Sequence, residues 1–456
     1  MFTLPLIISV SLPIIYAAAA AAHPRNHRQS ISFTFGEEYR LQDDSGLSNT
    51  QPVFQVTPPD GGLQPTADSS HATTQTTAVL SARPTTVWRP RDPNAYQHAR
   101  LRSLRLEEDE AVEWEQVEML GPDVEDKHTL GQLARMTGNA YALPGEKNWY
   151  DLDVAWNTSF PYGWEDAADG FRGHVFVSPE NSTVILSIKG TTLQGPTSKK
   201  DKFNDNLLFS CCCARVDFSW IFSTVCDCYA NKSRCDSTCL SNALVQDSLF
   251  YNIGVHMINN ITALYPTSTI WLVGHSLGGS LASLLGTTFG LPAVAFEAPG
   301  ERLAATRLSL PLPPDALSAH PPQTHLITSS VSGGGYHGSA PVTHVYHNAD
   351  PIPQGVCTGF GSPCASAGYA LETHCHLGKS IVYDTVGKLC WKVDVRNHVI
   401  RTVILDVIER DMVDGWEEDF DGFLREVPKA RVEEDCIDCY KWEFGDFKKK
   451  DLVSIL

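Results

Sequence analysis

The sequence has few basic residues for its length. Of 456 residues, 35 are Lys or Arg and 53 are Asp or Glu, so the formal net charge is −18. No basic run is longer than Lys448-Lys449-Lys450. Binding to nucleic acid needs clustered Lys and Arg to meet the phosphates. The composition therefore argues against a nucleic-acid partner, and the acidity by itself mainly indicates solubility.

Charge is also absent from the N-terminal segment. Residues 2–22 carry no charged side chain and are rich in Leu, Ile, Val and Ala. A helix of that length could just span a bilayer. Residues 1–22 therefore predict either a signal anchor that stays or a signal peptide cleaved within the alanine run. Arg25 and Arg28 follow this segment, and they weaken the usual argument that uses flanking basic residues to orient a membrane helix. A buried core helix is disfavoured, so we expect the chain to enter the secretory pathway.

Two further patterns agree with that compartment. Four triplets match the glycosylation acceptor pattern, at Asn157, Asn181, Asn231 and Asn260. Thirteen cysteines, seven of them between Cys211 and Cys239, suit an oxidising lumen. That cluster lacks the paired Cys-x-x-Cys spacing of zinc modules, so disulfides are favoured over a metal site. The odd number leaves at least one thiol free or bonded to another chain.

Four regions are predicted along the chain. Residues 1–22 form the anchor, and residues 23–110 form a lumenal tether, because Ser, Thr, Gln, Pro, Gly and Asp dominate from Ser48 to Pro93. Residues 111–410 form the catalytic body, which opens with an amphipathic pattern of predicted helices before Tyr141. Residues 411–456 form an acidic C-terminal extension that is expected to be partly folded.

The body alternates between strand patterns and helix patterns. Such alternation predicts an α/β fold with a largely parallel central sheet flanked by helices. An insertion rich in Pro, Ser, Gly and His, Pro311–Gly338, interrupts it. The predicted strands are Gly173–Val177, Val184–Ile188, Thr269–Val273, Pro292–Ala298 and Thr343–His347, and the predicted helices are Ala243–Leu264, Ser280–Phe289 and Val399–Ile408.

A candidate nucleophile lies between one of these strands and one of these helices. Ser276 is the centre of Gly274-His275-Ser276-Leu277-Gly278. An α/β-hydrolase needs Gly-x-Ser-x-Gly at a strand-to-helix turn, because the serine takes strained backbone angles and larger side chains two positions away would collide with neighbouring strands. The motif alone is weak, but its context favours a nucleophile over a structural serine.

Chain order limits the choice of acid, since in this fold the acid follows the serine and the histidine follows the acid. Asp350 comes directly after the strand Thr343–His347, where Pro351 and Pro353 stiffen the loop. Asp384 and Asp394 are rivals without such a loop. A turn cap before proline is the structural alternative for Asp350.

The preferred base is His398, which precedes the apolar pairs of the last predicted helix. His374 and His376 are its main competitors, and their spacing would also serve a metal. In the predicted mechanism His398 takes the Ser276 proton during attack on an ester carbonyl, and Asp350 orients the imidazole.

Two backbone segments are expected to stabilise the tetrahedral oxyanion. One donor is the N–H of Leu277, directly after the nucleophile. The other donor comes from Gly190-Thr191, which follows the strand Val184–Ile188 and combines a small residue with a hydroxyl group. A simple strand-end turn is the alternative interpretation of Gly190-Thr191.

These motifs resemble a known family. Lys189-Gly190-Thr191, GHSLGGSLASL and the Asn-x-Asp-Pro-x-Pro loop are similar to the class 3 lipases, which are α/β-hydrolases acting on glycerolipids. The segments DNLLFSCCCARVDFSW, GYALETHCHLGKSIVYDTVGK, DVRNHVIRTVILDVIE and CIDCYKWEFGDF resemble the fungal autophagy-related vacuolar lipases. The resemblance covers about Leu130 to Phe447.

The resemblance carries a triad onto Ser276, Asp350 and His398. It implies a cofactor-independent lipase and phospholipase that degrades membranes of autophagic and multivesicular bodies in the vacuole lumen. It also implies a single-pass type II membrane protein with a lumenal catalytic domain, whose partners are membrane phospholipids, neutral glycerolipids and the bilayer. A secreted triacylglycerol lipase or cell-wall esterase, and a non-catalytic lipid-binding module, are the alternatives.

Overall fold

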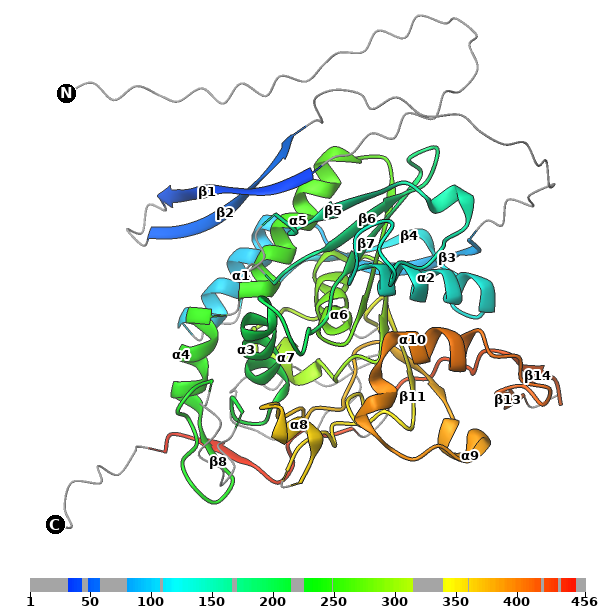
Figure 1. Ribbon diagram of the computed structural model, residues 1–456. Helices are drawn as coiled ribbons and strands as arrows, with labels where there is room; N and C mark the ends of the chain where they lie inside the picture. Colours follow the sequence, from blue (N-terminus) through cyan, green and yellow to red (C-terminus); the bar gives the residue numbers. More distant parts are fainter. Residues whose placement is uncertain are drawn as a thin grey trace, which may run out of the picture.

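The computed structural model describes residues 32–42, 48–57, 80–106, 110–165, 170–214, 225–247, 249–314, 339–359, 361–419, 422–433 and 436–447 (Figure 1). The expected anchor at residues 1–22 and most of the insertion Pro311–Gly338 lie outside these residues. Within them, no helix is both long enough and apolar enough to cross a bilayer.

A nine-stranded sheet forms the centre, with strand order β12-β11-β10-β9-β7-β6-β5-β1-β2. The five strands from β7 to β12 in that order pair in parallel, and β5, β6 and β7 pair antiparallel. The expected largely parallel sheet is thus confirmed. Its strands are β1 (Ser32–Gln42), β2 (Ser48–Thr57), β5 (Ser159–Tyr162), β6 (Gly173–Val177), β7 (Thr183–Ile188), β9 (Thr269–His275), β10 (Ala293–Phe296), β11 (Val342–His347) and β12 (Lys379–Tyr383).

Both faces of the sheet from β5 to β12 are apolar, and helices cover each of them (Figure 1). Because side chains alternate along a strand, Leu272 packs into one core and its neighbours Trp271 and Val273 into the other. Helices α5 and α6 contribute to the first core, and α2 and η3 contribute to the second. These elements are α2 (Lys127–Asn139), α5 (Leu249–Leu264), α6 (Leu277–Phe289) and η3 (Val403–Ile408).

The remaining elements lie in the connections and at the chain ends. The helices are α1 (Pro93–Leu106), η1 (Val154–Trp156), α3 (Ser198–Phe209), α4 (Ser237–Asp247), α7 (Arg302–Arg307), α8 (Pro363–Ser366), α9 (Thr385–Leu389), η2 (Val395–His398) and α10 (Ile400–Thr402). The strands are β3 (Ala82–Pro90), β4 (Trp114–Pro122), β8 (Arg234–Asp236), β13 (Glu417–Glu418), β14 (Leu424–Arg425) and β15 (Glu443–Gly445).

Four elements fall within the predicted tether, residues 23–110, so the tether prediction is wrong for β1 and β2 of the central sheet and for Ala82–Leu106. Strand β3 pairs with β4, and Val87 and Tyr96 are buried. The Tyr96 hydroxyl lies 3.4 Å from Thr288 Oγ1 of α6. A composition averaged over many residues conceals the few apolar side chains that anchor this segment. The helices expected before Tyr141 are also wrong for β4, although α2 confirms the second half of that prediction.

Disulfides account for twelve of the thirteen cysteines, which confirms the preference for disulfides over metal ligation. Cys390 is the remaining thiol, and it is exposed. Two bonds fasten the C-terminal extension to the body, and β15 also pairs with β8. The pairs are Cys211–Cys439, Cys212–Cys235, Cys213–Cys226, Cys228–Cys239, Cys357–Cys364 and Cys375–Cys436.

Candidate active site

Ser276 occupies the turn from β9 into α6, with φ 57° and ψ −130°. Non-glycine residues seldom adopt such a positive φ. The two glycines of the motif make the turn possible. A Cβ on Gly274 would lie 2.2 Å from the Gly278 carbonyl oxygen, and one on Gly278 would lie 2.2 Å from the carbonyl oxygen of Ile188 on β7. The sequence motif therefore reflects close backbone approach on both sides of the serine.

The structure brings Asp350 and His398 together. His398 Nδ1 donates to Asp350 Oδ2 over 2.6 Å, and the N–H of Ile352 donates to Asp350 Oδ1 over 3.0 Å. Burial alone would raise the pKa of Asp350, but His398 and these hydrogen bonds hold it below its ordinary value. Because Nδ1 of His398 is the donor, its Nε2 is the acceptor, as a serine hydroxyl requires.

A second histidine, His275, connects the base to the nucleophile's turn. Its Nε2 donates to the carbonyl oxygen of His398 over 2.8 Å, and its Nδ1 accepts from the Tyr141 hydroxyl over 2.8 Å. The rings of His275 and His398 lie 4.6 Å apart between centroids. Burial lowers the pKa of His275 to about 3, so the ring is neutral. Sequence reasoning missed this role of the residue directly before Ser276, and it had no means of pairing that residue with distant Tyr141.

The rival residues serve other contacts. Asp384 caps α9 and Asp394 caps η2 through their carboxylates. His374 and His376 pair with Asp438 and Glu433 of the C-terminal extension, at 3.3 and 2.7 Å. In the described part of the chain, Asp350 is therefore the acid that meets the preferred histidine.

The Gly190-Thr191 segment lies against the nucleophile. A Cβ on Gly190 would lie 3.1 Å from Ser276 Cβ and 2.2 Å from the His275 carbonyl oxygen. The Thr191 hydroxyl donates to Asp205 of α3, for which the sequence analysis predicts no role. Burial raises the pKa of that carboxyl to about 8. Since the Thr191 hydroxyl is engaged, its backbone N–H is the better candidate donor for an oxyanion.

The Lys189 side chain holds the Gly190-Thr191 segment in place by hydrogen bonds. Its Nζ donates to Asp201 Oδ2 over 2.9 Å and to the Gly190 carbonyl oxygen over 2.7 Å. The Thr192 N–H donates to the same Asp201 oxygen over 2.9 Å. On the other side, Leu277 is the first residue of α6, so its N–H has no acceptor within the helix. The N–H groups of Leu277 and Thr191 are therefore the candidate donors.

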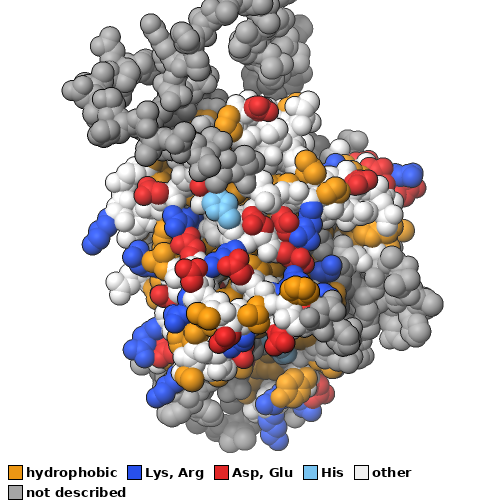
Figure 2. Space-filling view, turned by 90° about the vertical axis from the view of Figure 1, so that its right-hand side faces the viewer, with side chains coloured by type: hydrophobic (Ala, Val, Ile, Leu, Met, Phe, Trp, Pro, Cys, Tyr) orange, Lys and Arg blue, Asp and Glu red, His pale blue; other side chains and the backbone are white. Residues whose placement is uncertain are grey.

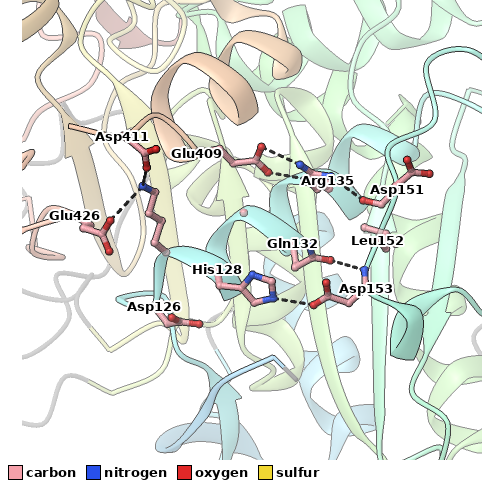
Figure 3. A pocket seen from close by; sticks show the side chains of 12 residues that line it. Asp126, His128, Gln132, Arg135, Asp151, Leu152, Asp153, Glu409, Asp411 and Glu426 are labelled. Atoms are coloured by element: carbon pink, nitrogen blue, oxygen red, sulfur yellow. Dashed lines mark hydrogen bonds and ion pairs between the residues drawn. The ribbon is translucent and has the colours of Figure 1, made fainter. Parts of the chain in front are cut away.

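A polar cavity of about 680 Å³ lies apart from these residues (Figure 3). It is bordered by α2, the 151–153 segment and the residues after η3. Its charged side chains pair with each other: Lys127 with Asp411 and Glu426, and Arg135 with Glu409. Figure 2 likewise shows acidic and basic side chains interspersed over one face of the molecule. The cavity lies between α2 and the C-terminal extension, and no member of the predicted triad lines it.

Among the described residues, two groups hold possible metal ligands close together. They are Cys213, Cys226 and Cys228, and His374, Cys375 and Cys436. Every cysteine of both groups is in a disulfide, whereas a metal needs thiolates.

Three of the four predicted glycosylation sites are exposed: Asn157, Asn181 and Asn231 lie in turns or at element ends. Asn260 is half-buried on α5. Glycosylation at these residues stays a prediction.

Comparison with known proteins identifies the family of this chain. The family model "Lipase (class 3)" matches residues 209–291. "Putative lipase ATG15" of Cryptococcus neoformans var. neoformans serotype D (strain B-3501A) is 46% identical, covering 74% of this chain and 70% of the relative. The protein of the same name from Mycosarcoma maydis is 40% identical, covering 79% and 75%. A solved triacylglycerol lipase from Penicillium expansum is 18% identical, with a TM-score of 0.28, and the match covers 56% of this chain and 78% of the lipase chain. The curated relatives show that the chain, which itself matches the class 3 lipase model, belongs to the ATG15 family of fungal lipases.

Proposed function

We propose that Ser276, His398 and Asp350 are the catalytic residues of this lipase. Ser276 Oγ attacks the ester carbonyl while His398 Nε2 takes its proton and then returns it to the leaving alcohol. Water hydrolyses the acyl-enzyme through the same histidine. Asp350 holds the imidazole in the required tautomer. The observation that carries this proposal is the 2.6 Å bond between His398 Nδ1 and Asp350 Oδ2, beside a serine in a strained strand-to-helix turn.

The oxyanion would accept hydrogen bonds from the N–H groups of Leu277 and Thr191. Gly190 supports this assignment because it leaves no room for a side chain between the loop and Ser276. Removal of one such donor typically lowers turnover about 10²–10³-fold.

The proposed substrates are membrane phospholipids and neutral glycerolipids of autophagic and multivesicular bodies. The family membership supports the autophagy-related role. Six disulfides and three exposed acceptor asparagines support a lumenal catalytic body. Delivery on the multivesicular-body membrane, as a single-pass type II protein held by residues 1–22, completes the proposal.

Vesicles that contain phosphatidylcholine, phosphatidylserine and trioleoylglycerol test the substrate class. The full-length chain and its His398→Ala variant are added to them, and the lipids are quantified by mass spectrometry. We expect the wild type alone to release fatty acid from the phospholipids as well as from trioleoylglycerol. Release from trioleoylglycerol alone would favour a plain triacylglycerol lipase. N-terminal sequencing of the mature chain separates a retained anchor from secretion after cleavage.

A further inference from the structure

Glu297 occupies a position beside the nucleophile that the mechanism above does not use. Strand β10 is the parallel neighbour of β9, and Phe296 pairs with His275 in the register. Glu297 and Ser276 therefore directly follow the paired ends of β10 and β9. Glu297 also has a left-handed backbone, with φ 44°. A side chain that is kept in such a conformation points to a specific requirement at this site.

The Glu297 carboxyl group is completely buried next to the acid of the triad. Its Oε1 accepts from the backbone N–H of His347 over 3.1 Å. Its Oε2 is buried without a hydrogen-bond partner, and the carboxyl of Asp350 is the neighbouring acidic group that acts on the Glu297 carboxyl. Two carboxylates cannot share a hydrogen bond unless one of them carries a proton.

Among the described residues around Glu297, no positive charge would neutralise its carboxylate beside the carboxylate of Asp350. The His347 ring lies 3.9 Å away, between its Nε2 and Glu297 Oε1. That Nε2 lies 3.2 Å from the Asn397 carbonyl oxygen, and Nδ1 accepts from the Ala349 N–H, so the hydrogen bonds describe a neutral ring. Burial also lowers the pKa of His347.

The other titratable groups near Glu297 are on neighbouring elements. Tyr346 precedes His347 on β11, and its phenol is neutral because burial raises its pKa. His398 faces Asp350 from η2, and neutral His275 lies beyond it. The single formal charge opposite Glu297 is therefore the carboxylate of Asp350.

We propose that Glu297 carries a proton on Oε2 and donates it in a hydrogen bond to Asp350, so that it positions Asp350 and, through it, His398. The inference rests on the proposed function of the triad. Glu297 touches no reacting atom and is a positioning residue. It stabilises the Asp350 anion without adding a charge, which an aspartate or glutamate anion in its place could not do. The N–H of Ile352 donates to Asp350 Oδ1, and His398 Nδ1 donates to Asp350 Oδ2.

Burial, with the Asp350 charge second, raises the pKa of Glu297 well above its ordinary value. In alkaline solution Glu297 must eventually lose its proton and place a second anion against Asp350. The hydrogen bond is then lost, and the two carboxylates repel each other. Activity should therefore fall reversibly on the alkaline side.

Two variants of the full-length chain test this inference. Glu297→Gln keeps an acceptor for the His347 N–H and a donor for Asp350, but it cannot ionise. Glu297→Gly removes the group and suits the left-handed backbone, so it separates loss of the hydrogen bond from backbone strain. The rate constant kcat/KM on p-nitrophenyl butyrate is measured against pH, with thermal unfolding monitored at each pH.

We expect Glu297→Gly to lose at least about tenfold in kcat/KM while it stays folded, and Glu297→Gln to recover most of that loss. We also expect Glu297→Gln to keep its activity at alkaline pH where the wild type declines. The infrared difference spectrum between wild type and Glu297→Gln at neutral pH should contain the C=O band of a protonated carboxylic acid.

The inference is overturned if that band is absent, or if Glu297→Gln follows the alkaline decline of the wild type. Failure of the proposed function has a different outcome, in which the wild type does not hydrolyse the ester at all. The infrared band still tests the proton on Glu297 in that case.

Discussion

Two histidine–carboxylate pairs in this molecule have nearly the same geometry but different surroundings. His398 lies 2.6 Å from Asp350, and His376 lies 2.7 Å from Glu433, measured between Nδ1 and a carboxylate oxygen. In the second pair, Nε2 is also engaged, because it lies 3.1 Å from the Ala298 carbonyl oxygen. Burial alone would lower the pKa of His376, but Glu433 and Glu301 raise it to about 9.

His398 differs in exposure and in its neighbours. Its side chain is 15% exposed, whereas that of His376 is 1% exposed. It adjoins the turn of Ser276 through His275, while His376 joins the C-terminal extension to the body. The comparison teaches that a short imidazole–carboxylate bond does not identify a catalytic base. The second nitrogen has to be an acceptor within reach of a nucleophile.

The largest expected difference between the two pairs is in catalysis. His398→Ala should lower kcat/KM on a soluble ester by at least about 10⁴-fold, because Ser276 loses its base. His376→Ala should lower it only as far as it lowers the folded fraction. The measurement is kcat/KM per folded molecule, with the folded fraction taken from circular dichroism. Equal losses in the two variants would contradict the distinction.

The second difference is in stability. Glu433→Gln removes the carboxylate that is hydrogen-bonded to protonated His376 and leaves Glu301 as the remaining anion near the ring. It should lower the free energy of unfolding by about 2–4 kcal/mol, with Glu301 and the partial exposure of Glu433 favouring the lower values. Urea denaturation at constant pH measures this change. Asp350→Asn, the matched carboxylate-to-amide change at the other pair, should cost less because the His398 ring is more exposed than the His376 ring. A larger loss for Asp350→Asn would reverse this order.

The stabilisation by the His376–Glu433 pair should depend on pH. The pKa of His376 is raised to about 9, so its contribution is complete below its ordinary value of 6.5 and is lost as pH rises through about 9. The pKa of Glu433 is lowered from 4.5, so its contribution is lost at lower pH. The difference in unfolding free energy between wild type and Glu433→Gln should therefore be largest between about pH 4.5 and 6.5. Unfolding curves across this range check the window, and a difference that grows towards pH 9 would contradict it.

The smallest expected effect concerns the contact that places His398. Tyr141→Phe removes the hydroxyl that donates to His275 Nδ1, and a single neutral hydrogen bond of this kind should change kcat by about tenfold or less. KM for a soluble ester should change little. Steady-state kinetics on folded protein measure both constants. A loss as large as that of His398→Ala would mean that Tyr141 acts in the chemistry itself.

The sheet and Ser276 could be predicted because their patterns are local. The strand before Ser276, its two glycines and the helix after it lie within a short segment, and chain order limited the acid to Asp350 or a few rivals. The residues alone preferred His398 over His374 and His376, because it precedes the apolar pairs of the last predicted helix, and the family resemblance strengthened that choice. Only the fold reveals which of their second nitrogens is engaged.

The supporting residues could not be predicted in the same way. Glu297 meets Asp350 because β10 lies between β9 and β11, and Tyr141 meets His275 across the sheet edge. The first contact follows from strand order and the second from the packing of the segment after α2 on the end of β9, and no local pattern of residues encodes either. The tether prediction is wrong at Ala82–Leu106 for a related reason, because Val87 pairs with β4 and Tyr96 contacts Thr288 of α6.

Covalent labelling of Ser276 by a fluorophosphonate tests the central claim most directly. The rate is measured on full-length wild type, His398→Ala and His376→Ala, and the modified residue is mapped by mass spectrometry. We expect Ser276 to be labelled in the wild type and in folded His376→Ala, and at least about 100-fold more slowly in His398→Ala. Labelling of another serine, or a rate at Ser276 that does not depend on His398, would contradict the account.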